Sequence, residues 1–147
     1  MTPTLLLVLA LVAPVEDPAA PSGRLPSDVD ACALVTRAEA AVLLGGLRRD
    51  PLPQTGYQQE RECHYVSERG AQLSVSVYTA DRWDLQKGIV SEMSPADVPG
   101  LGDEAFAVRR GTYAEVYVRK GALLLEVRGS AGMEVSRGMA AKAAGRL

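Results

Sequence analysis

The sequence is poor in the residues from which metal sites and nucleophilic sites are most often built. Its 147 residues include one histidine and two cysteines, so a structural zinc site with four Cys or His ligands would lack a ligand. The histidine, His64, directly follows Cys63, and neighbouring residues on a strand point to opposite faces. Cys63 and His64 are therefore not expected to share a site, and the local pattern supports no catalytic set, metal site or cofactor site.

A surplus of basic residues is also absent. The chain carries 16 Lys and Arg against 18 Asp and Glu, and loss of an N-terminal segment containing Glu16 and Asp17 would leave 16 acids against 16 bases. Nucleic-acid binding depends on positive charge that neutralises phosphates. The composition therefore disfavours a nucleic-acid partner.

No apolar run is long enough for a permanent membrane span. The longest, Leu5 to Ala13, has nine residues and would rise about 14 Å as a helix, whereas a bilayer core needs about 20 residues. A polar, proline-containing stretch follows it, which is typical of a secretory signal. We expect residues 1–23 to be a signal-peptide-like leader and linker, and residues 24–147 to be a single secreted or extracytoplasmic domain. The first cysteine after the run is Cys32, too distant for lipid attachment.

The two cysteines are expected to form a disulfide, because export delivers them to an oxidising compartment. A bond between Cys32 and Cys63 would close a loop of about 30 residues, and in the chain-entropy model such a loop contributes about 3 to 4 kcal/mol. We therefore expect the disulfide to be a large part of the stability of so small a domain.

Capping signals, turn residues and periodicity predict an α+β domain. A Thr36 to Glu39 capping box starts a helix that Gly45 ends. Helices are expected over 37–44, 82–93 and 133–144, strands over 61–67, 71–79, 105–109, 113–120 and 122–128, and a loop or edge strand within 48–60. The sequence thus predicts an antiparallel sheet of about five to six strands, packed against two to three helices and carrying one disulfide.

Periodicity also assigns faces to several of these elements. In the middle helix Leu85, Ile89 and Met93 form one i, i+4 row, which we expect to face the core. The last two strands alternate, so that Ala114, Val116, Val118, Leu123, Leu125 and Val127 share an apolar face, while Tyr113, Glu115, Tyr117, Glu126 and Arg128 share the other.

The polar face of the last hairpin is the candidate binding surface. Its tyrosines offer apolar rings with polar tips, a combination common at binding sites. The hypothesis names Tyr113, Glu115, Tyr117 and Arg128 as binding residues. The alternative is an ordinary solvated sheet face without a ligand.

Three short motifs occur in order along the chain. They are Asp-x-Cys-x-Leu-x-Thr at Asp30, Cys32, Leu34 and Thr36, Cys-x-Tyr at Cys63 and Tyr65, and Gly-x-Gly-Asp-Glu-Ala at Gly100, Gly102, Asp103, Glu104 and Ala105. In this order they resemble a family of small actinobacterial exported proteins and lipoproteins that carry a domain of unknown function. The resemblance implies a protein tethered to or released outside the membrane, although the lipidated leader cysteine frequent in that family is missing here.

The sequence favours a non-catalytic extracytoplasmic binding or accessory domain of the cell envelope, with an envelope or extracellular ligand or protein as its partner. One alternative is a small secreted, hydrolase-like enzyme whose site combines distant residues, such as His64 with a carboxylate. A structural envelope component is another. A deep pocket that holds His64 beside a carboxylate would favour the enzyme, and a flat exposed face would favour binding.

Overall fold

A computed structural model of the chain describes residues 23–56 and 60–147. Most of the expected leader lies outside these residues. Helices are α1 (Ala31–Leu34), α2 (Arg37–Leu44), α3 (Trp83–Val90) and α4 (Met133–Arg146), with 3-10 turns at Pro26–Asp28, Ala80–Arg82 and Ser91–Met93. Strands are β1 (Leu52–Thr55), β2 (Arg61–Val66), β3 (Gln72–Thr79), β4 (Ala96–Asp97), β5 (Glu104–Arg110), β6 (Tyr113–Lys120) and β7 (Leu123–Gly129).

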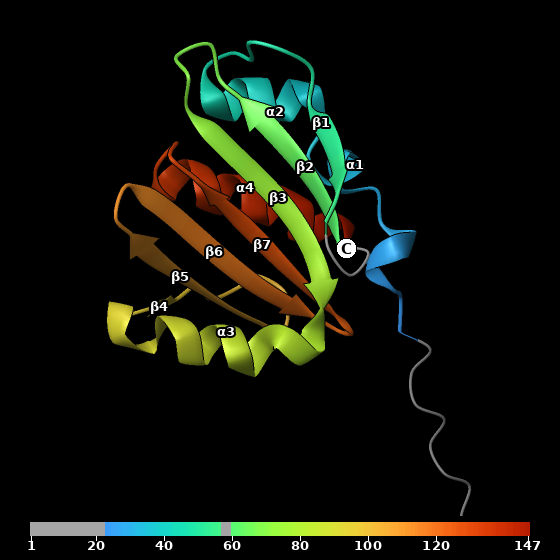
Figure 1. The fold of residues 1–147 in the computed structure, drawn as a ribbon, viewed down its shortest axis with the longest axis vertical. Coiled ribbons are helices and arrows are strands. Elements are labelled where there is room, and N and C mark those ends of the chain that lie inside the picture. The colour runs from blue at the N-terminus through green and yellow to red at the C-terminus, as the bar shows by residue number, and fades with distance from the viewer. Residues whose placement is uncertain (1–22, 57–59) are drawn as a thin grey trace, which may run out of the picture.

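The strands form one antiparallel sheet in the order β1-β2-β3-β7-β6-β5-β4 (Figure 1). The hairpins β2–β3 and β6–β7 are confirmed, and pairing of β3 with β7 joins them at the centre of the sheet. The α+β class is also confirmed, but within the described residues the sheet has seven strands rather than five or six, and there are four helices rather than two or three. The additional elements are short: β4 has two residues and α1 has four, too few to produce a periodic signal.

β1 is an edge strand in which Pro53 occupies an outward position. Gly56 donates to the Glu60 carbonyl, and hydrogen-bonded pairs alternate in an antiparallel ladder, so the amide position of Pro53 faces away from β2. A missing N–H at that position costs no ladder hydrogen bond. The proline also leaves the exposed edge of β1 without one N–H donor, with which a strand of another chain could pair.

One face of the sheet is covered by α1, α2 and α4, which lie behind the strands in Figure 1. The apolar positions predicted for β6 and β7 face these helices and are buried. The sheet contributes Leu73, Val75, Val77, Val116, Val118, Leu125 and Val127, and α4 contributes Met139, Ala140, Ala143 and Ala144. The small side chains of α4 let this helix lie close to the sheet, which is why the main core forms here.

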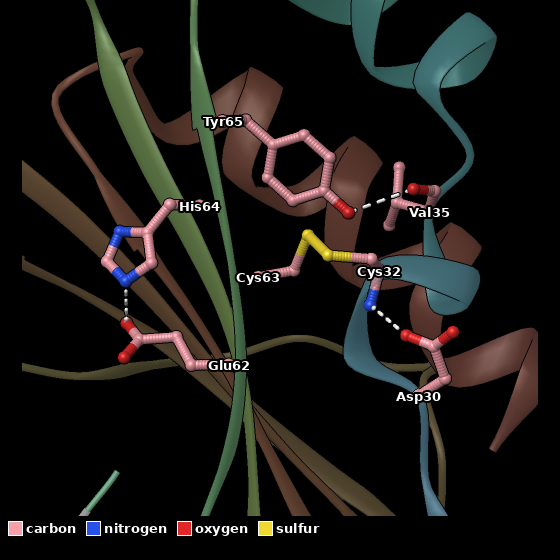
Figure 2. The surroundings of a disulfide bond; sticks show 7 residues. All are labelled: Asp30, Cys32, Val35, Glu62, Cys63, His64 and Tyr65. Atoms are coloured by element: carbon pink, nitrogen blue, oxygen red, sulfur yellow. Dashed lines mark hydrogen bonds and ion pairs between the residues drawn. A yellow bond between two sulfur atoms is a disulfide. The ribbon is translucent and has the colours of Figure 1, made fainter. Parts of the chain in front are cut away.

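The predicted disulfide between Cys32 and Cys63 is present and joins α1 to β2 (Figure 2). Asp30 caps α1 by accepting from the Cys32 amide at 3.0 Å. The buried Tyr65 hydroxyl donates to the Val35 carbonyl at 2.8 Å. The disulfide therefore joins the N-terminal helices to the sheet, beside a buried tyrosine whose hydroxyl is hydrogen-bonded.

The predicted capping box of α2 is also present, and its Glu39 contacts a residue near the C-terminus of the chain. The Thr36 hydroxyl accepts from the Glu39 amide, and the Glu39 carboxylate accepts from the Thr36 amide at 3.0 Å. Arg146 of α4 binds the same carboxylate through both terminal nitrogens at 2.8 and 2.9 Å. The Arg146 bond, together with Thr36, lowers the pKa of Glu39 to about 2.

The predicted core face of α3 is wrong. Leu85 is 61% exposed, and Ile89 and Met93 are also exposed, whereas Trp83 and Val90 are buried against the sheet. The i, i+4 spacing did place Leu85 and Ile89 on one side of a helix, but Trp83 and Val90 lie on the opposite side and pack in a cluster with residues of the sheet. The helix also ends at Val90, before the 3-10 turn that includes Met93.

The Gly-x-Gly-Asp segment holds the β6–β7 hairpin. Gly102 has φ +57°, and an added Cβ would lie 2.4 Å from the Arg119 carbonyl oxygen, so only glycine fits this close approach. The adjacent Asp103 carboxylate accepts from the Gly121 amide at 2.7 Å. The motif therefore has a structural role, as a clamp on the hairpin turn.

Within the described ranges, no helix is long and apolar enough to cross a membrane.

Candidate functional site

The sheet face opposite α1, α2 and α4 carries a row of polar side chains at its centre. Cross-strand pairs place His64 beside Ser74, Ser74 beside Arg128, and Arg128 beside Glu115. A second row pairs Glu62 with Ser76, Ser76 with Glu126, and Glu126 with Tyr117. Directly opposed residues share a face, so the two rows bring together residues far apart in sequence.

The helix α3 covers one end of this face, at the bottom of Figure 1. Trp83 packs on Phe106 with ring centroids 5.1 Å apart, and Phe106 stacks on Tyr117 at 4.8 Å. The Trp83 indole donates to Glu104 at 3.1 Å. Tyr117 is therefore part of a second apolar cluster and is not solvated, contrary to the expected solvated face.

Glu115 is also buried, with 1% of its surface exposed. Its carboxylate lies 3.2 Å from Arg110 Nε and 3.5 Å from Arg128 Nε, and it accepts from the Tyr117 hydroxyl at 2.9 Å. Burial, with Glu126 and Glu115 nearby, raises the pKa of Tyr117 far above its ordinary value, so the hydroxyl stays protonated and donates. Glu115 thus anchors two arginines and does not itself face a ligand.

Glu126 lies beside this network and is 9% exposed. Burial and the negative charge of Glu115 raise the pKa of Glu126 from 4.5 to about 7, while Arg128 and a hydrogen bond with Tyr78 act in the opposite direction. The carboxyl group therefore changes charge near neutral pH, at the centre of the sheet.

Glu62 and His64 project from β2 on the side opposite Cys63 and Tyr65, as Figure 2 shows and as the strand alternation predicted. His64 Nε2 lies 3.2 Å from Glu62 Oε1. The contact has the distance of an ion pair, but its angles do not make a hydrogen bond, and buried Nε2 has no hydrogen-bond partner among residues 23–56 and 60–147. Glu62 thus holds the ring through a contact that is charged only when His64 is protonated.

A hollow of about 210 Å³ opens between these side chains. Its lining residues are Glu62, His64, Gln72, Leu73, Ser74, Tyr113, Arg128 and Gly129. Tyr113 is 39% exposed, and the Arg128 guanidinium lies 5.3 Å from its ring centroid. The hollow combines an exposed aromatic ring, an arginine and several neutral donors, which are the usual constituents of a polar ligand site.

Two of the larger hollows offer fewer free polar groups. One of about 560 Å³ lies between residues 27–31 and strands β1 and β2, yet its Asp28 and Asp30 already accept from the Leu25 and Cys32 amides. An apolar hollow of about 320 Å³ lies at Val42 and Leu43 of α2, next to Lys142. We therefore place the candidate site at the smaller hollow on the sheet, because in the described ranges the Ser74 hydroxyl and the terminal nitrogens of Arg128 have no hydrogen-bond partner.

The structure divides the four binding residues suggested by the sequence. Tyr113 and Arg128 line the hollow, Glu115 lies beneath it, and Tyr117 lies under α3. Sequence reasoning missed Ser74 and Glu62 as parts of the site. The signal was present in the hairpin register, since a β2–β3 turn at residues 68–70 sets His64 opposite Ser74.

Within the described part of the chain, no group of three or more His, Cys, Asp or Glu side chains is arranged to hold a metal ion. Both cysteines belong to the disulfide. The carboxylates at and beneath the hollow are each paired with a base, Glu62 with His64 and Glu115 with Arg128.

No protein-family model matches the chain, and no curated protein matches it. Among solved structures, the chain is similar to a GTP binding regulator from Thermotoga maritima, with 19% sequence identity and a TM-score of 0.45. The match covers 73% of this chain and 87% of that chain. A likeness of this extent supports no inference about function.

Proposed function

We propose that this protein is an extracytoplasmic binding or accessory domain of the cell envelope, and that its binding surface is the hollow lined by Tyr113 and Arg128. The observation that carries the proposal is the hollow itself. An exposed tyrosine ring, an arginine and the Ser74 hydroxyl converge there on one face of the sheet. A binding domain needs such a preorganised surface and no reactive group.

Export is supported by the disulfide, because such bonds persist in oxidising compartments. It is also supported by the apolar run at residues 5–13 and by the resemblance to small actinobacterial exported proteins. In that resemblance the shared residues have structural roles: Asp30 caps α1, Thr36 caps α2, and Gly102 fits beneath the hairpin. These motif residues therefore mark a fold, and the proposed binding residues Tyr113 and Arg128 lie outside the motifs.

Export is tested by the intact mass of the protein recovered from medium, envelope and cytosol, with and without thiol alkylation. The proposal predicts a shortened chain outside the cytosol that takes up no alkylating reagent. A full-length, doubly alkylated chain confined to the cytosol would contradict it.

Binding is tested with a library of small polar fragments and the full chain, followed by ligand-observed NMR. Tyr113→Ala should reduce the number and affinity of the binders, because it removes the ring against which they pack. Leu85→Ala is the matched control, since Leu85 is 61% exposed on α3 and is not among the residues that line the hollow. Equal binding by both variants would refute the surface.

The contact between His64 and Glu62 favours a second candidate function, a small secreted hydrolase. Ser74 has two cross-strand neighbours, His64 on β2 and Arg128 on β7. These positions match a nucleophile, a base and a cation that could stabilise an oxyanion. It ranks second because no hydrogen bond joins His64 to Ser74 in the described ranges. Labelling of Ser74 by a fluorophosphonate probe, lost in His64→Gln, would establish it, and an unlabelled serine would remove it.

A further inference from the structure

The inference drawn here concerns the ligand of the hollow and therefore rests on the proposed function. Its starting point is the row His64, Ser74 and Arg128, which crosses three adjacent strands on one face. Each of these side chains can donate a hydrogen bond, and Gln72 adds an amide donor at the rim of the hollow.

The strand register brings these groups close together. Ser67 donates to the Ala71 carbonyl, so the alternation of the β2–β3 ladder makes His64 and Ser74 a non-hydrogen-bonded pair. Side chains in such pairs approach most closely, with Cα atoms about 4.5 Å apart. Ser130 donates to the Gln72 carbonyl, which by the same alternation makes Ser74 and Arg128 a hydrogen-bonded pair. The two ladders are consistent with each other, and they place Ser74 between the His64 ring and the Arg128 guanidinium.

Two contacts orient the Arg128 side chain, one with Glu115 and one with the Tyr113 ring. Its Nε lies 3.5 Å from the buried Glu115 carboxylate, which Arg110 and Tyr117 hold in place. Tyr113 packs against its guanidinium. Since the Nε side of Arg128 faces Glu115, the two terminal nitrogens are left for another acceptor, and no hydrogen bond of Arg128 to any residue of 23–56 or 60–147 occupies them. Half of the Arg128 side chain is exposed.

The two carboxylates at and beneath the hollow are already paired. The Glu62 carboxylate contacts His64, and the Glu115 carboxylate contacts two arginines and a tyrosine. Donors are thus in surplus at the wall of the hollow, while the carboxylates are paired. A small group rich in acceptors and carrying negative charge complements this arrangement.

We propose that the hollow binds an oxyanion, the carboxylate or phosphate group of a ligand, through the terminal nitrogens of Arg128 and the hydroxyl of Ser74. The planar arginine fork matches both groups by paired hydrogen bonds. The Tyr113 ring packs against the adjoining part of the ligand. The volume of about 210 Å³ holds one such group with a short substituent, so a larger ligand extends beyond the hollow.

The experiment uses the full chain and the fact that His64 is its only histidine, which gives one set of imidazole signals by NMR. Inorganic phosphate and acetate are added separately at constant ionic strength, with chloride as the reference salt. The proposal predicts saturable shifts of the His64 ring and of the Ser74 amide with at least one of the two. Phosphate alone, acetate alone or both would identify the source of the oxyanion. No saturable shift beyond that of chloride overturns the proposal.

Variants test the assigned groups. Arg128→Gln should weaken binding at least tenfold, because it removes the charge but keeps a planar side chain on Tyr113. Ser74→Ala should weaken it about twofold to fivefold, the loss of one neutral donor. Arg49→Gln, an exposed arginine between α2 and β1, is the control and should bind like the parent. Unchanged binding by Arg128→Gln refutes the assignment, and should that variant fail to fold, unchanged binding by Ser74→Ala does so.

The oxyanion and the binding surface are tested by different outcomes. Neutral fragments that bind the hollow while neither anion binds would refute the oxyanion and leave the binding surface intact. Failure of every probe to perturb β2, β3 and β7 would count against both.

Discussion

The two faces of the sheet are made by the same strands and differ in almost every other respect. The face under α1, α2 and α4 is apolar at its centre and carries the disulfide, with Val75, Val116 and Leu125 fully buried. The opposite face is apolar where α3 covers it. Away from α3 it carries a network of carboxylates and arginines around a hollow. Because alternate residues point to opposite sides, one face supplies stability while the other is free to carry charge.

The largest expected effect comes from the covered face. Replacement of Cys32 and Cys63 by alanine should lower the free energy of unfolding by about 3 to 4 kcal/mol, because the bond closes a loop with a sequence separation of 31. Urea denaturation of the variant and the parent measures this difference. A loss below about 1 kcal/mol would mean that α1 is held to the sheet by packing alone.

A matched pair of leucines sharpens the contrast between covered and exposed positions. Leu125→Ala should cost about 3 kcal/mol, since Leu125 is fully buried and its removal leaves a cavity. Leu85→Ala should cost less than about 0.5 kcal/mol, because Leu85 is on the outer side of α3. Thermal or urea unfolding compares the two. Similar costs would restore the sequence-based prediction that Leu85 faces the core.

The open face should give the protein a distinctive pH dependence. In the folded state Glu126 stays protonated up to about pH 7, whereas in the unfolded chain it ionises near 4.5, so the folded protein binds more protons between these values. Stability should therefore fall as pH rises from about 4.5 to about 7, by up to about 3 kcal/mol.

Glu126→Gln should remove this loss, because glutamine keeps the neutral form at all pH values. Glu39 does not interfere, since its pKa is lowered to about 2 and its contribution is lost only as pH falls below about 4.5. Urea titrations of the parent and Glu126→Gln at several pH values isolate the effect. Parallel stability curves would contradict a neutral Glu126 in the folded protein.

A smaller effect distinguishes two tyrosines on the same strand. Tyr117→Phe should cost about 1 to 2 kcal/mol, because it leaves the buried Glu115 carboxylate without one donor. Tyr113→Phe should change the free energy of unfolding by less than about 0.5 kcal/mol, since Tyr113 is partly exposed. Equal values from denaturation curves would show that the Glu115 network contributes nothing to stability.

Local patterns in the sequence predicted most of the fold. The Thr36 capping box, the alternation of β3, β6 and β7, and two cysteines in one chain were sufficient for the helix, the hairpins and the disulfide. For residues 48–60 they left a loop or an edge strand open, because Pro53 weakens the strand signal, and the edge strand is β1. They were insufficient for β4, since two residues give no period. Pairing of β3 with β7 depends on contacts distant in sequence, which no local pattern contains.

The candidate site was harder to predict because its residues come from separate hairpins. Tyr113 and Arg128 were found from one hairpin, but Ser74 and Glu62 join them only through the pairing of β3 with β7. Tyr117 was misjudged for a related reason. Alternation gives the face of a residue, but whether a helix such as α3 then covers that face depends on tertiary packing.

The division between the two faces is tested most directly by a residue-by-residue map of backbone amide shifts in the full chain as binding fragments are added. The account predicts perturbations around the hollow, at residues 62–64, 72–74 and 128–129. Perturbations that gather instead at Val42 and Leu43, in the apolar hollow of α2 beside Lys142, would place binding on the covered side and contradict it.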